Sequence, residues 1–99
     1  MKGDLNSRTP QAVEQDLVSD RLALASRYAD CLRRLAATAS RLGLADLADA
    51  IADLSRAVDR MANDLAVSDY GVVVLGRAGR LIGTVERVLA KKSREAVLH

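Results

Sequence analysis

The sequence predicts an all-α fold in which three helices pack as an antiparallel, up-down-up bundle. The first observation is a run of bulky apolar residues at alternating spacings of three and four, which places one side chain per turn on one helix face. This seam consists of Leu44, Leu47, Ile51, Leu54, Val58, Met61 and Leu65. The second is composition, since 49% of the residues are hydrophobic and 28% are charged, as in globular proteins. The third is the scarcity of aromatic residues, two Tyr and no Phe or Trp, which suits helices in close contact.

The length of the chain predicts one domain. A chain of 99 residues can bury one core but has no room for a second. Residues 1–8 carry no apolar pattern and are expected to form a short disordered tail before a domain of residues 9–99. The tail lacks the apolar centre of a signal peptide, and no run of about 18 apolar residues is present that could span a membrane. We therefore expect a cytoplasmic protein without a membrane span.

Helix boundaries are marked by local signals in the first two thirds of the chain. Thr9 is a good N-cap and Pro10 suits the first helical position, so the first helix is expected over about 10–42. Gly43 supplies the left-handed residue that ends many helices. The second helix, about 44–67, carries the seam. Because the connection between these two helices is so short, they are predicted to be antiparallel neighbours.

The third helix, expected over about 69–97 after a cap at Ser68 or Asp69, carries conflicting signals. Four glycines fall within thirteen residues, and each glycine inside a helix costs about 0.8–1 kcal/mol relative to Ala. Three consecutive Val residues, 72–74, favour a strand. Whether residues 70–83 are helical throughout therefore stays open. On a helix, three of these glycines fall on one side, where another helix could approach closely: Gly76, Gly79 and Gly83.

Charge is unevenly distributed along the chain. Residues 42–69 carry two Arg and six Asp, a net charge of −4, and residues 71–99 carry six basic and two acidic side chains, a net charge of +4. If the second and third helices are neighbours, this difference favours their pairing by about 0.2–1 kcal/mol for each exposed pair. Five basic side chains of the third helix are expected on one face: Arg77, Arg80, Arg87, Lys91 and Arg94. Three interpretations of this face stay open: it contacts a phosphate backbone, it contacts a protein partner, or it is only solvated.

Nine residues, 74–82 (Val-Leu-Gly-Arg-Ala-Gly-Arg-Leu-Ile), resemble the Gly-x-x-Gly loop of KH nucleic-acid-binding domains. In that family the loop clamps phosphates with its backbone and flanking basic residues. The rest of this chain departs from the family, because no pair of strands precedes the loop and too little chain follows Ile82 for the sheet. The resemblance therefore supports only the hypothesis that a basic, glycine-rich face of this segment contacts phosphates.

Residues with the chemistry of catalysis or metal binding are few. Cys31 lies on the apolar stripe of the first helix, where a small buried hydrophobe is expected rather than a catalytic thiol. The one histidine, His99, is the last residue, which makes a Ser-His or Cys-His site implausible. Asp46, Asp49 and Asp53 share a face of the second helix but lack the inward Glu-x-x-His motifs of carboxylate metal sites. We therefore predict no enzyme activity, metal or cofactor.

Two functions remain from the sequence. The favoured one is a small non-enzymatic protein–protein interaction module, such as an adaptor, an inhibitor or a regulatory subunit, with a protein partner or a second copy as its target. The alternative is a nucleic-acid-binding accessory protein that uses the basic face of the third helix. Membrane-surface binding by that helix ranks below both, because it lacks the Trp and Phe that such helices favour.

Overall fold

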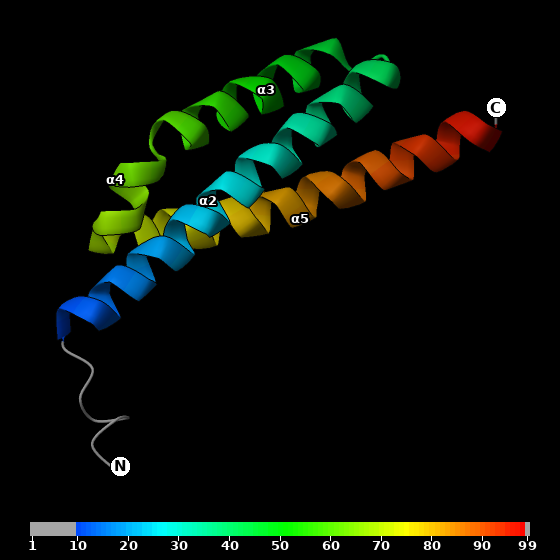
Figure 1. Cartoon of the computed structure of the whole chain (residues 1–99). Helices are drawn as coiled ribbons and strands as arrows, with labels where there is room; N and C mark the ends of the chain where they lie inside the picture. The colour runs from blue at the N-terminus through cyan, green and yellow to red at the C-terminus, as the bar shows by residue number, and fades with distance from the viewer. Residues whose placement is uncertain (1–9, 99) are drawn as a thin grey trace.

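The computed structural model describes residues 10–98 of the chain, with side chains described from Leu17 to Val97. The described residues form four helices and no strand: α2 (Pro10–Arg41), α3 (Ala45–Arg60), α4 (Ala62–Val67) and α5 (Asp69–Leu98) (Figure 1). The all-α prediction is confirmed, whereas the predicted count of three helices is not. The predicted tail, residues 1–8, and the predicted cap Thr9 lie outside the described residues.

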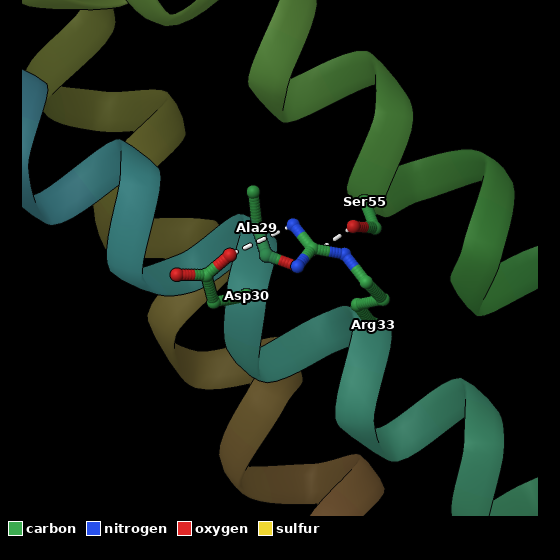
Figure 2. A network of polar contacts seen from close by, with 4 residues as sticks. All are labelled: Ala29, Asp30, Arg33 and Ser55. Carbon is green, nitrogen blue, oxygen red and sulfur yellow. Dashed lines mark hydrogen bonds and ion pairs between the residues drawn. The ribbon is translucent and has the colours of Figure 1, made fainter.

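Helix α2 lies at the centre of the molecule, because α3, α4 and α5 all pack against it. Its most extensive contact is with α3, which returns antiparallel along it (Figure 1). Small residues make this contact close: Ala29 is 1% exposed, and its carbonyl oxygen accepts a hydrogen bond of 2.7 Å from Ser55 Oγ of α3 (Figure 2). Two turns of helix are thereby joined in the core, and the buried Ser55 hydroxyl is satisfied.

The connection between α2 and α3 is a Schellman motif. Gly43 has φ +78°, the left-handed conformation predicted for it. The Gly43 N–H donates to the Ser40 carbonyl at 3.0 Å, and the Leu44 N–H donates to the Ala39 carbonyl at 2.9 Å. These two bonds satisfy carbonyls at the end of α2 and reverse the chain within three residues.

The predicted second helix, 44–67, is wrong in one respect, because it is broken at Met61 into α3 and α4. Met61 is 47% exposed and so is not a buried member of the seam. In α4 the consecutive residues Leu65 and Ala66 are both buried, since α4 contacts α2 and α5 at once. The bend at Met61 allows this double contact, and Arg21 of α2 donates from Nη1 to the Ala66 carbonyl at 3.2 Å.

Helix α5 is continuous, so the KH-like loop does not exist: residues 74–82 are helical. Ser68 is its cap, and its Oγ accepts a hydrogen bond of 3.0 Å from the Gly71 N–H. At Gly71 a side chain would overlap the carbonyl oxygen of Leu65, so glycine is required where α4 turns into α5. Of the three glycines expected to let another helix come close, one does so: an added Cβ at Gly79 would lie 2.6 Å from the Tyr28 hydroxyl of α2.

Helices α3 and α5 are not neighbours. No Cα atom of α3 lies within 8 Å of a Cα atom of α5, both helices being fully described. The C-terminal end of α5 lies well away from the turn between α2 and α3 (Figure 1). The condition under which their opposite charges would favour pairing, that the second and third helices are neighbours, is therefore not met by α3, because α3 and α5 pack separately on α2. The molecule measures 65 × 26 × 17 Å, far from spherical.

Candidate protein-interaction surface

Helix α5 carries two apolar seams, of which one is covered. The inner seam has spacings of four and three and packs into the core. Four of its members are large or branched side chains with at most 9% of their surface exposed: Leu75, Ile82, Val85 and Leu89. Gly71 and Ala78 complete it. This seam explains why α5 stays docked on α2 despite its glycines.

The second seam runs beside the first and shares Ala78 and Val85 with it. Its other members, Val74, Leu81 and Val88, repeat every seven residues and form what we call the outer edge of α5. Leu81 is 44% exposed and Val88 is 43% exposed, whereas Val74 is half-buried. A helix with two seams normally has a neighbour on each. Among the residues with described side chains, nothing fully covers Leu81 and Val88 of the outer edge, and α3 does not reach α5.

The predicted seam of the second helix divides into a buried and a half-exposed part. Ile51, Val58 and Leu65 are buried, and Leu44 is half-buried. The remaining three members again repeat every seven residues and form what we call the outer edge of α3: Leu47, Leu54 and, at the break that ends the helix, Met61. Leu47 and Leu54 are half-buried against the core, and Met61 is largely exposed. The exposed carboxylates of Asp46, Asp49 and Asp53 lie on the adjoining solvent face.

The structure brings the five predicted basic residues together on one face. Arg77, Arg80, Arg87, Lys91 and Arg94 are all exposed, on the side of α5 away from its inner seam. Among the residues with described side chains, α5 contains one ion pair, between Lys92 and Glu95 at 3.6 Å. Neither of these two residues belongs to the basic face. Arg87 Nη2 donates to the Thr84 hydroxyl at 3.3 Å. The face spans seventeen residue steps, about 25 Å of helix, and directly adjoins the outer edge of α5.

The residues considered for catalysis and metal binding form no such centre in the described part of the chain. Cys31 is half-buried in a shallow hollow between α2 and α5, beside Tyr28, Arg34 and Ile82. Between residues 17 and 97, no three His, Cys, Asp or Glu side chains are grouped closely enough to hold a metal ion. Asp53 pairs with Arg56 at the surface, and His99 lies outside the described residues.

None of the helices in the described range contains a stretch apolar and long enough to cross a bilayer. No family model, curated protein or solved structure matches the chain significantly.

The five basic residues were named from the sequence, but the outer edge of α5 was not. Val74, Leu81 and Val88 are apolar and lie next to the inner seam, so the sequence alone does not distinguish them from one broad apolar face. A signal was present, because residues 74, 78, 81, 85 and 88 form their own seam, one step removed from the inner seam. Two overlapping seams on one helix indicate two neighbours.

Proposed function

We propose that this chain is a non-enzymatic protein–protein interaction module, an adaptor, inhibitor or regulatory subunit, whose binding surface is the outer edge of α5. The observation that carries the proposal is the exposure of Leu81 and Val88 on a helix that is otherwise patterned for two neighbours. Anchors that repeat once in two turns of helix are typical of recognition between helices. The adjoining arginines supply a polar rim, which would favour an acidic partner.

The expected binding energy is concentrated in few side chains. Complete burial of a Val or Leu side chain is worth about 1.5–3 kcal/mol relative to full exposure. Because Leu81 and Val88 are already more than half covered, each offers roughly half of that amount to a partner. Replacing either by a charged residue would also bury an unpaired charge at the interface, which makes a double substitution a stringent test.

The test compares two double variants of the tagged chain in its native host. Leu81→Glu with Val88→Glu alters the outer edge, and Val72→Glu with Val97→Glu is the matched control. The control residues are 50% and 83% exposed, lie on α5 outside both seams and away from Arg77 and Arg80, and add the same charge. We expect the edge variant to capture at least ten-fold less protein than wild type does. Its helical content, measured by circular dichroism, should be unchanged. Equal capture by both variants and wild type would refute the proposal.

A second candidate function, binding to nucleic acid, is favoured by the five exposed basic side chains without acidic partners among the described residues. Phosphate contacts would make the affinity for DNA or RNA fall by about 0.7–0.9 log units per log unit of salt for each phosphate contacted.

Replacing Arg77, Arg80 and Arg87 by Gln removes three charges and keeps helix propensity nearly constant. If the chain is a protein-interaction module, wild type binds nucleic acid feebly at about 0.15 M salt, and the triple variant differs little. Fluorescence anisotropy with labelled DNA and RNA measures this. Sub-micromolar binding by wild type that disappears in the triple variant, together with a shallower salt slope, would make nucleic-acid binding the better assignment.

A further inference from the structure

We propose that the outer edge of α5 binds the outer edge of α3 in a second copy of this chain, giving a two-fold symmetric dimer with two α3–α5 contacts. This inference rests on the proposed function and names the partner of the same surface. Within one chain no Cα atom of α3 lies within 8 Å of one of α5, and Met61, Leu81 and Val88 are each more than 40% exposed, so both edges retain surface for another copy.

The two edges match in length and in pattern. The edge of α3 runs from Leu47 to Met61, the residue that caps the helix, and that of α5 runs from Val74 to Val88. Each therefore spans fourteen residue steps, about 21 Å. Each has three large apolar residues at intervals of seven. Small residues lie between these anchors, Ala50 and Ala57 on α3 and Ala78 on α5. Alternation of large and small side chains lets the ridges of one helix enter the grooves of another.

Charge decides which edges pair. Helix α3 carries four Asp and two Arg, a net charge of −2, whereas α5 carries six basic and three acidic residues, a net charge of +3. The exposed Asp46, Asp49 and Asp53 flank the edge of α3, and the exposed Arg77 and Arg80 flank that of α5. Pairing of α5 with another α5 would place like charges together, which opposes association. Pairing of α3 with α5 places opposite charges together.

Two-fold symmetry makes the contact self-complementary. If α3 of one copy meets α5 of the other, the symmetry generates the same contact a second time. Neither edge is then left exposed, and the assembly closes at two copies. A single helix edge would offer only a small interface, and its duplication brings the buried area closer to that of stable complexes.

The first test is the mass of the purified chain by sedimentation equilibrium, which does not depend on molecular shape. We expect a dimer, with twice the chain mass of 10.6 kDa. The variant Leu81→Glu with Val88→Glu should dimerise at least ten-fold more weakly, and the control Val72→Glu with Val97→Glu should match wild type. A wild type that stays monomeric at every concentration overturns the inference.

Charge reversal tests which helices meet. Variant A carries Asp46→Arg and Asp49→Arg, and variant B carries Arg77→Glu and Arg80→Glu. Each alone should dimerise at least ten-fold more weakly than wild type, because both contacts then join like charges. An equimolar mixture of A and B should regain wild-type affinity, because both contacts of the mixed dimer join opposite charges. If variant A dimerises as well as wild type, α3 is not in the interface and the inference fails.

Disulfide trapping gives a readout that does not depend on affinity. In a Cys31→Ala background, Leu54→Cys is placed in one preparation and Leu81→Cys in another, and the two are mixed and oxidised. A cross-linked pair of one chain from each preparation is expected. Within a single chain no Cα atoms of α3 and α5 come within 8 Å, whereas a disulfide needs about 4.4–6.8 Å. A chain with both substitutions should therefore also cross-link between copies, and a bond within one chain would contradict the inference.

The failure of this inference is distinct from the failure of the proposed function. A purified chain that is monomeric, but whose outer edge is still needed to capture another protein, refutes the dimer and leaves the interaction module in place. A chain that captures nothing through that edge and is also monomeric refutes both.

Discussion

Leu32→Asp is expected to abolish folding. Leu32 is the largest fully buried side chain of the described core, at 0% exposure in the C-terminal half of α2. An unpaired charge at such a site costs several kcal/mol, which is comparable to the whole stability of a small domain, about 5–15 kcal/mol. The elongated shape of this molecule leaves it a thin core, so its stability is expected at the lower end of that range. Circular dichroism at 222 nm should show a largely unfolded chain at 25 °C.

The matched control for this experiment is Val73→Asp. Val73 is 49% exposed on α5, outside both seams, so a carboxylate there stays hydrated. Substitutions at such surface positions usually change the free energy of unfolding by no more than about 0.5 kcal/mol. A cooperative thermal transition for Leu32→Asp close to that of Val73→Asp would show that α2 is not the centre of the core.

Helix ends were predictable because their signals are local. Gly43 adopts the left-handed conformation expected of it, and Ser68 caps the helix that follows, since each depends on two or three neighbouring residues. The break at Met61 was not predictable in this way. No Pro or Gly lies there, and the apolar spacing continues through the bend, because periodicity reports which face is buried and not whether the axis is straight.

The candidate site also has one feature that could be predicted from the sequence and one that could not. The exposure of Arg77 and Arg80 follows from their position opposite the apolar seam, so the basic face could be placed from the sequence. The exposure of Leu81 could not, because it depends on where α3 lies, more than twenty residues away in the chain. Apolar spacing predicts that a side chain needs a neighbour, but it does not say whether that neighbour belongs to the same chain.

The glycines of α5 offer the sharpest test of the packing, because the same substitution is expected to act with opposite sign at two positions. Gly71→Ala places a Cβ into the backbone carbonyl of Leu65, which cannot rotate away, so α4 and α5 must separate. Overpacking of this kind costs about 1–3 kcal/mol or more. At Gly76 the nearest heavy atom to an added Cβ is the tip of the Arg80 side chain, 3.7 Å away. Gly76→Ala should therefore gain helix propensity and stabilise the protein by about 0.8–1 kcal/mol.

Urea unfolding measures both changes, provided that the dependence of the free energy on urea concentration is the same for all variants. The midpoint should fall for Gly71→Ala and rise for Gly76→Ala. Gly79→Ala should lie between them, because the Tyr28 hydroxyl that it meets at 2.6 Å belongs to a side chain that can shift. This order separates two explanations of the glycines. If they are present only because the helix tolerates them, all three substitutions stabilise. If α4 and α5 meet as the structure shows, Gly71 alone is indispensable, and a rise in the midpoint for Gly71→Ala would disprove that contact.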